Sequence, residues 1–123
     1  MHGSVLTAGS LISEIIEGLS DLSVDSRIAV CPSFVHLDLV CQILKNSGSK
    51  IELGAQDARA ENEGAFTGDI SASMLKDFGA SIVLVGHSER RLGHGESDEL
   101  IASKFGAIKD TELTPVLCVG ESE

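Results

Sequence analysis

The sequence predicts an α/β fold in which parallel strands alternate with helices. Four short apolar, β-branched runs occur at residues 27–30 (RIAV), 50–53 (KIEL), 81–85 (SIVLV) and 115–119 (PVLCV). Amphipathic stretches lie between them, and spacings of 23, 31 and 34 residues between successive strand starts leave room for one crossover helix each. Runs this short and this continuously apolar are typical of parallel strands buried on both faces.

The first two helices are predicted from apolar side chains that recur on one helical face. The first stripe consists of Leu11, Ile12, Ile15, Ile16 and Leu19. The second stripe, over residues 35–44, consists of Leu39, Val40, Ile43 and Leu44. Gly48 follows the second stripe, and glycine at this position predicts a helix that ends in the left-handed conformation.

Two further helices are predicted later in the chain. The third stripe consists of Ile70, Met74, Leu75 and Phe78, and Gly79 follows it. The fourth stripe consists of Ile101, Phe105 and Ile108. It is preceded by the sequence SDEL, in which Ser97 can cap the helix while two acidic residues place negative charge in its first turn.

The length and the two ends of the chain bear on domain organisation. A length of 123 residues fits one domain. The chain begins within a few residues of a helix, with no strand before it, and closes at VGESE directly after a strand. A domain of repeating strand–helix units seldom begins and ends halfway through its unit. We therefore expect residues 1–123 to be part of a longer α/β protein.

The composition disfavours several classes of partner. The formal net charge is −10, so phosphate backbones and anionic lipid surfaces are repelled overall. Four phenylalanines and no tryptophan or tyrosine offer little surface for stacking nucleobases. A small anionic substrate would need a local positive pocket, and the only basic doublet is Arg90–Arg91. Such a doublet is more often a solvated face or a structural ion pair.

The three cysteines, Cys31, Cys41 and Cys118, show no CxxC pairing and no metal-ligand spacing. Their odd number predicts reduced thiols in a cytosol, and the apolar runs around Cys31 and Cys118 predict that these two are buried and inert. No basic segment followed by an apolar stretch marks the N-terminus, and no window approaches eighteen apolar residues. A soluble, cytoplasmic protein is expected.

Cofactor and metal motifs give no support for a bound group. The chain contains no GxGxxG and no GK[ST] sequence, and the HGE sequence at His94 lacks the second histidine of a helical zinc motif. We therefore predict no cofactor and no metal. His2, His36 and His94 are expected to be loop or surface residues.

A dense polar cluster follows the third predicted strand. Gly86 allows a tight turn, and His87, Ser88 and Glu89 come directly after it, where parallel α/β folds gather their catalytic groups. A histidine at a helix N-terminus is favoured as neutral imidazole, which suits a hydrogen-bond donor to a carbonyl. The alternative is structural: Ser88 caps the helix and Glu89 pairs with one of the two arginines that follow it. Spacing alone gives the two interpretations equal weight.

A second polar stretch, residues 54–77, follows the second predicted strand. It carries glycines at 54, 64 and 68 without the spacing of a nucleotide-binding loop. A loop of this length is often functional, commonly as a binding segment or a contact between subunits.

Several long motifs closely resemble the triosephosphate isomerase family. The sequence GAFTGDISASMLKDFGASIVLVGHSERR is followed by GESDELIASKF and TPVLCVGE, and CPSFVHL and GAQD precede it in the family's order. The resemblance runs along the whole chain. It implies a (β/α)8 TIM barrel of roughly 250 residues, of which residues 1–123 would form a partial barrel. That part would extend from the first helix to the end of the fifth barrel strand, with about four parallel strands and alternating helices.

The resemblance also implies an activity and a set of residue roles. The family interconverts dihydroxyacetone phosphate and glyceraldehyde 3-phosphate, in glycolysis and gluconeogenesis, without a cofactor. His87 matches the family's electrophilic histidine, whose neutral state is an established family property. Glu89 matches the glutamate that helps to organise the family's lysine and histidine, and Ser88 matches the serine that contacts the closed active site.

The resemblance further implies a homodimer. Thr67, in GAFTG, matches the tip of the loop that inserts into the neighbouring subunit near its active site. Gln56 and Arg90 match positions at this dimer contact or in its support.

Other family groups find no match in the chain. The general base, a glutamate in a YEP motif, is absent, as are the family's lysine and asparagine. Isomerisation needs a base for the carbon-bound proton and an electrophile for the resulting charge, so the polypeptide alone is expected to have negligible activity. One alternative is a non-catalytic interaction module that retains the dimer loop. A barrel assembled from two copies ranks last, because it would duplicate His87 and still lack the lysine and the base.

Overall fold

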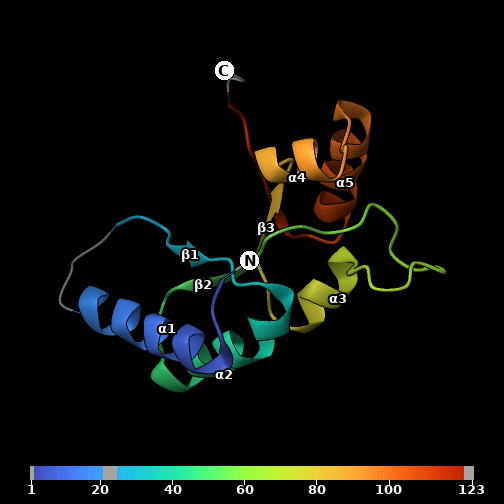
Figure 1. Cartoon of the computed structure of the whole chain (residues 1–123). Helices are drawn as coiled ribbons and strands as arrows, with labels where there is room; N and C mark the ends of the chain where they lie inside the picture. The colour runs from blue at the N-terminus through green and yellow to red at the C-terminus, as the bar shows by residue number, and fades with distance from the viewer. Residues whose placement is uncertain (1, 21–24, 121–123) are drawn as a thin grey trace.

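Four parallel strands form one sheet, in the order β1-β2-β3-β4, in a computed structural model of the chain (Figure 1). The structure describes residues 2–20 and 25–120. The strands are β1 (Ala29–Val30), β2 (Glu52–Ala55), β3 (Ile82–Val85) and β4 (Thr114–Leu117). The helices are α1 (Val5–Leu19), the 3-10 helix η1 (Phe34–His36), α2 (Leu37–Ser47), α3 (Ala72–Asp77), α4 (Ser88–Gly93) and α5 (Asp98–Asp110). The predicted α/β fold with parallel strands is confirmed.

All four predicted strands exist, but two of them are shifted along the chain. The strand predicted at 50–53 lies at 52–55, and the one predicted at 115–119 lies at 114–117. Ile51 lies outside β2, with its N–H donating to the Ser49 hydroxyl at 3.2 Å. The register places Gly54 opposite Ile82 and Ile82 opposite Thr114. The carboxyl ends of the strands therefore meet along one edge of the sheet.

The helix boundaries follow from local hydrogen bonds. α1 begins with a reciprocal cap in which the Thr7 N–H donates to Ser4 Oγ at 3.2 Å and the Ser4 N–H donates to Thr7 Oγ1 at 2.7 Å. α2 ends at Gly48 with φ 64°, which confirms the predicted stop. Ser97 caps α5 as predicted, because its hydroxyl accepts from the Leu100 N–H at 3.3 Å.

The third predicted helix is shorter than its apolar stripe. Ser71 caps α3 by accepting from the Met74 N–H at 3.3 Å, so the helix starts at Ala72 and Ile70 lies before it. The Ile70 carbonyl instead accepts from the Arg59 N–H at 2.8 Å. The loop between β2 and α3 is therefore tied back on itself at its base.

The apolar core lies between the helices and one face of the sheet. α1 packs on α2, α2 packs on β2, and α5 packs on β3 and β4 (Figure 1). On β3, Val83 and Val85 are fully buried, whereas Ile82 and Leu84 on the opposite face are only half-buried. The prediction that the strands are buried on both faces is therefore correct for β2, in which Leu53, Gly54 and Ala55 are all buried, and wrong for β3 and β4.

The cysteines and one histidine also differ from expectation. Cys41, on α2, is the buried thiol and donates to the Phe78 carbonyl at 3.1 Å. Cys31 and Cys118 are half-buried at strand ends rather than buried. Burial, with a smaller effect from Cys118, raises the pKa of Cys31. His36 was expected to be a loop or surface residue, but it lies in η1 and is only 8% exposed. Its Nδ1 lies 2.9 Å from Ser33 Oγ.

An ion pair at the start of β2 predicts a pH-dependent contribution to stability. Glu52 accepts from Arg27 at 2.6 and 2.8 Å and from Ser81 at 2.6 Å, and these bonds lower the pKa of Glu52 to about 2. A carboxyl whose pKa is lower in the folded state than in the unfolded state stabilises the fold at pH values above its unfolded-state pKa. This stabilisation is lost as the pH falls through the folded-state pKa. Glu52→Gln is therefore expected to lower the free energy of unfolding by about 1–2 kcal/mol at neutral pH. The effect is no larger because Arg27 is 67% exposed and solvent screens its attraction to Glu52.

This cost is expected to disappear as the pH falls from about 4.5, the ordinary glutamate value, towards 2. Urea unfolding of both proteins across that window measures the difference. Glu14→Gln, on the exposed side of α1, is the control. A difference between wild type and Glu52→Gln that stays constant down to pH 2.5 would contradict the assignment.

Candidate functional site

The turn at Gly86 sets the position of His87 after β3. Gly86 has φ 71°, and a Cβ there would lie 2.9 Å from Arg91 Nη2 and 3.1 Å from Ile101 Cγ2. Only glycine fits this backbone conformation beside these two side chains. The chain then enters α4 at Ser88, so His87 stands at the carboxyl edge of the sheet, where the sequence placed it.

His87 is the N-cap of α4, and its ring is held by a backbone donor. The Glu89 N–H donates to His87 Nδ1 at 3.3 Å. Because Nδ1 accepts this bond, a neutral ring must carry its proton on Nε2. The side chain is 46% exposed, so Nε2 can reach a bound molecule. The arrangement offers one oriented N–H donor at the end of the sheet.

Ser88 and Glu89 do not take the structural roles weighed for them. Ser88 is the first residue of α4 rather than its cap, because His87 occupies the cap position. Glu89 is 88% exposed and makes no ion pair with either following arginine among the described residues. Its Oε2 lies 3.7 Å from His87 Nδ1, which is too long for a hydrogen bond. Both side chains are exposed beside His87, and neither makes a side-chain hydrogen bond within residues 2–20 and 25–120.

Arg90 and Arg91 form structural ion pairs, as the charge pattern suggested. Arg90 Nε lies 2.7 Å from Glu96 Oε1 and 2.9 Å from Asp57 Oδ2. Arg91 Nε donates to the Gly86 carbonyl at 2.7 Å, and its Nη1 lies 2.7 Å from Asp98. Both guanidinium groups are thus turned into the protein and anchor the helix that begins next to His87.

A buried charged cluster supports this anchor. It consists of Asp57, Arg90, Glu96 and Lys104, contributed by the loop after β2, by α4, by the α4–α5 turn and by α5. Lys104 Nζ donates to both oxygens of Asp57 at 2.9 Å and to Glu96 Oε1 at 2.6 Å. Two carboxylates and two cations balance formally, which is how charges with this little exposure are tolerated.

The two carboxyls of the cluster respond differently. Burial raises the pKa of Asp57 against the opposing effect of Lys104. Burial acts in the same sense on Glu96, but the hydrogen bonds from Lys104 and Arg90 outweigh it and hold the pKa of Glu96 below its usual range. Glu96 Oε2 is buried and has no hydrogen-bond partner among the described residues.

Two of the three proposed subunit-contact residues, Thr67 and Gln56, lie on the loop after β2 rather than on α4 beside His87. Thr67 is exposed on the loop of residues 56–71, which projects from the body on the right of Figure 1, away from α4. Gln56, at the start of this loop, donates to the Cys31 carbonyl at 3.0 Å and ties the ends of β1 and β2 together. Only Arg90 of the three shares a helix with the histidine site.

Sequence reasoning missed three members of the buried cluster and one loop residue. Asp57, Glu96 and Lys104 are far apart in the chain, and each looks like an ordinary surface charge when read alone. The one available signal for Lys104 was its position three residues after Ile101 on the apolar stripe of the fourth helix. Arg59 is the loop residue, and its side chain contacts Glu61, Phe66 and Asp69.

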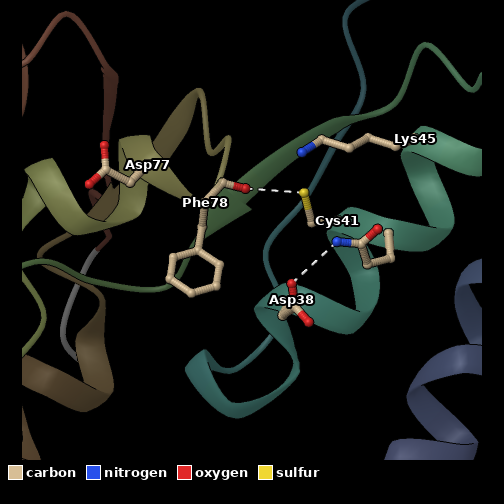
Figure 2. Close-up of a pocket in the computed structure, with 6 residues that line it drawn as sticks. Asp38, Cys41, Lys45, Asp77 and Phe78 are labelled. Atoms are coloured by element: carbon tan, nitrogen blue, oxygen red, sulfur yellow. Dashed lines mark hydrogen bonds between the residues drawn. The ribbon is translucent and has the colours of Figure 1, made fainter.

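A separate groove of about 240 Å³ lies between α2 and α3 (Figure 2). It is lined by Asp38, Cys41, Gln42, Lys45, Asp77 and Phe78. Figure 2 shows the Cys41 thiol engaged with the Phe78 carbonyl, while the Asp77 carboxylate points away from it. The groove thus brings no reactive pair together, and the histidine end of β3 remains the better candidate site.

Neither a metal-ligand cluster nor a membrane-spanning helix occurs among the described residues. Across residues 2–20 and 25–120, no three or more His, Cys, Asp or Glu side chains are grouped as they would be around a metal ion. In the same part of the chain, no helix has the length and apolar character needed to cross a membrane.

Comparison with known proteins places this chain in a family. The model of the triosephosphate isomerase family matches residues 1–123. The triosephosphate isomerases of Vibrio parahaemolyticus and Vibrio cholerae are each 49% identical to the chain, over 119 and 126 aligned positions. These alignments cover 93% and 100% of this chain, and 46% and 48% of the relatives.

A solved structure shows the same relation. The crystal structure of triosephosphate isomerase from Bartonella henselae superposes with a TM-score of 0.86 at 36% identity, covering 99% of this chain and 48% of that one. The fold is therefore a partial TIM barrel, as predicted. The chain spans about half the length of the curated relatives it matches.

Proposed function

The chain belongs to the triosephosphate isomerase family, and from this premise we propose that the protein interconverts dihydroxyacetone phosphate and glyceraldehyde 3-phosphate. The observation that carries the proposal is the hydrogen bond from the Glu89 N–H to His87 Nδ1. In the neutral ring, this bond leaves Nε2 as the N–H donor. A donor of that kind can polarise the substrate carbonyl.

The proposed chemistry moves a proton between two adjacent carbons. When a base removes the proton from carbon, negative charge develops on the carbonyl oxygen, and a positioned N–H donor stabilises it. We assign this donor to His87 Nε2. Ser88 and Glu89 are both exposed beside the ring, and we assign them to contacts with the remainder of the active site. The anchoring of α4 by Arg90 and Arg91 would keep the donor in place during the reaction.

The 123-residue polypeptide by itself is proposed to be inactive. It contains no tyrosine, so the Tyr-Glu-Pro motif that carries the family's base is not among these residues. We expect no turnover above background from the chain purified from a host without its own isomerase. Fusion of the chain to all segments of the Vibrio cholerae relative that it does not match, which are expected to carry the family's lysine and asparagine as well as its base, is expected to restore turnover.

This experiment separates the candidate functions. Near-normal turnover of the chain alone would overturn the proposed inactivity. No turnover of this fusion protein, although it is folded, would favour the non-catalytic interaction module. The observation that favours this second candidate is that the loop around Thr67 is complete within the chain, whereas the base is not supplied by it.

We propose that a second copy of the chain is the protein partner. Support comes from the exposed tip at Thr67 and from two exposed apolar side chains, Met74 (48%) and Phe78 (49%), in and at the end of α3, the helix that follows the loop. Isolated apolar residues are common on surfaces, but aromatic residues and methionine are enriched at interfaces.

Thr67→Glu is expected to weaken self-association by at least about tenfold, because it places a charge at the centre of the contact in a chain with a net charge of −10. Sedimentation equilibrium over a concentration series measures the dissociation constant. Ala102→Glu adds the same charge on the exposed side of α5 and serves as the matched control. Equal weakening by both variants would argue against a specific contact at Thr67.

A further inference from the structure

Arg59 has contacts that neither the proposed chemistry nor the buried cluster uses. It lies near the start of the loop of residues 56–71, and its guanidinium carbon stands 3.6 Å from the centroid of the Phe66 ring. Its Nη1 donates to Asp69 Oδ2, and its Nε lies 2.8 Å from Glu61 Oε2 without hydrogen-bond geometry. One side chain thus contacts three residues spread along the loop.

The backbone of Arg59 also closes the base of the loop. Its N–H donates to the Ile70 carbonyl at 2.8 Å, and it pairs with Ser71 in an isolated parallel bridge. The backbone therefore fixes where the loop leaves and rejoins the body, while the side chain reaches towards the tip. These two sets of contacts are independent, so the side chain can be changed without breaking the closure.

The tip itself is built around Phe66. Gly64 has φ 145°, and a Cβ at this position would lie 2.6 Å from the Phe66 ring. The Phe66 N–H donates to the Gly64 carbonyl and the Asp69 N–H donates to the Phe66 carbonyl, each at 3.0 Å. Thr67 lies between these bonds. The position of Thr67 therefore depends on the position of its neighbour Phe66.

We infer that Arg59 is a positioning residue that holds the Phe66–Asp69 tip in the shape required to contact a second copy of the chain. The consequence for association rests on the homodimer proposed above, whereas the effect on the shape of the loop does not. Ordering the loop before contact lowers the entropy lost on association, so the dimer gains affinity without a new intersubunit bond.

The size of the effect follows from the exposure of the groups. Arg59, Asp69 and Glu61 side chains are 35%, 45% and 49% exposed, so each ion pair contributes little by itself. The cation–π contact adds roughly 0.5–1 kcal/mol at an exposed site. Since one guanidinium makes all three contacts, removing it is expected to raise the equilibrium population of the open tip about tenfold.

The chemistry favours arginine over lysine at this position. A planar guanidinium can lie over a ring while its edge meets two carboxylates, whereas an ammonium offers a point charge. Arg59→Met keeps an apolar side chain but removes both the planar group and the positive charge. Arg59→Lys keeps the positive charge but removes the planar group. We therefore expect the larger effect from Arg59→Met and a partial effect from Arg59→Lys.

The test combines two measurements on the 123-residue chain. Amide hydrogen exchange at Phe66 and Asp69, at concentrations where sedimentation shows a monomer, reports the shape of the tip. The dimer dissociation constant reports the consequence for association. We expect exchange about tenfold faster in Arg59→Met and about threefold faster in Arg59→Lys, with a matching weakening of the dimer. Arg27→Lys, which changes another exposed arginine–carboxylate pair, is expected to leave both unchanged.

A double variant distinguishes positioning from general destabilisation. If Arg59 acts through the ring, Arg59→Met is expected to accelerate exchange at Asp69 much less in a Phe66→Leu background than in wild type. Full additivity of the two changes would overturn the inference.

The outcomes separate this inference from the homodimer proposal. Unchanged exchange in both Arg59 variants would overturn the positioning role whatever the dimer does. Faster exchange with an unchanged dissociation constant would overturn the link to association. Faster exchange in a chain whose wild type never dimerises would retain the positioning role and overturn the homodimer.

Discussion

Replacing Lys104 by methionine is expected to lower the free energy of unfolding by about 3–5 kcal/mol. Lys104 is 6% exposed and serves the carboxylates of Asp57 and Glu96, which are 10% and 3% exposed. Without its ammonium group, these two buried carboxylates share only Arg90. The cost arises from leaving charge buried without a partner, since a buried ion pair itself contributes little net stability. Urea unfolding with linear extrapolation measures it.

Lys76→Met is the matched control for this experiment. Lys76 also pairs with a carboxylate, at 2.7 Å from Glu112, but the two side chains are 48% and 84% exposed. Solvent screens such a pair, so a loss below about 1 kcal/mol is expected. Adding Glu96→Gln to Lys104→Met should recover part of the loss, because it removes one unpaired charge. Equal losses from the two lysine variants would show that the cluster is not buried as described.

Replacing His87 by alanine is expected to lower turnover by about 10²–10³ when the chain is fused to the segments of the Vibrio cholerae relative that it does not match. The change removes the Nε2 donor and leaves the Gly86 turn, α4 and its arginine anchors in place. A donor that acts on charge developed in the transition state should lower kcat and kcat/KM together. Steady-state kinetics in both directions of the isomerisation measure the two constants.

His94→Ala is the control, because His94 is an exposed histidine at the other end of α4. It is expected to leave kcat within about twofold of wild type. The circular dichroism and the thermal unfolding of the fusion protein should be unchanged in both variants. Turnover of His87→Ala within threefold of wild type would refute the electrophile assignment, although not the membership of the family.

The element pattern could be predicted from the sequence because it depends on local chemistry. Apolar stripes place the helices, Ser97 and Gly48 mark two of their ends, and short β-branched runs mark the strands. The end of α3 at Gly79 was visible for the same reason, whereas its start was not. Ile70 belongs to the apolar stripe, yet its carbonyl bonds to Arg59 across the loop, and no local pattern contains that bond.

The position of His87 was also determined by the sequence. It follows an apolar strand and a glycine and precedes a polar helix start, so it must lie at the carboxyl end of β3. Its role as the cap of α4 was decided by the fold, because Gly86 turns the chain so that the ring meets the Glu89 N–H. The partners of Arg90 were decided in the same way. Asp57 and Glu96 lie 33 residues before and six residues after it in the chain, and only the packing of α5 against the sheet brings them together.

The sequence by itself thus determined the fold class, the family and the residue at the end of β3. The tertiary structure decided which charges are buried, which thiol is covered and how Arg59 holds its loop. The physical reason is the range of the interactions. Caps, turns and apolar periodicity act within a few residues, whereas burial and ion pairing depend on segments that meet only when the sheet and its helices have assembled.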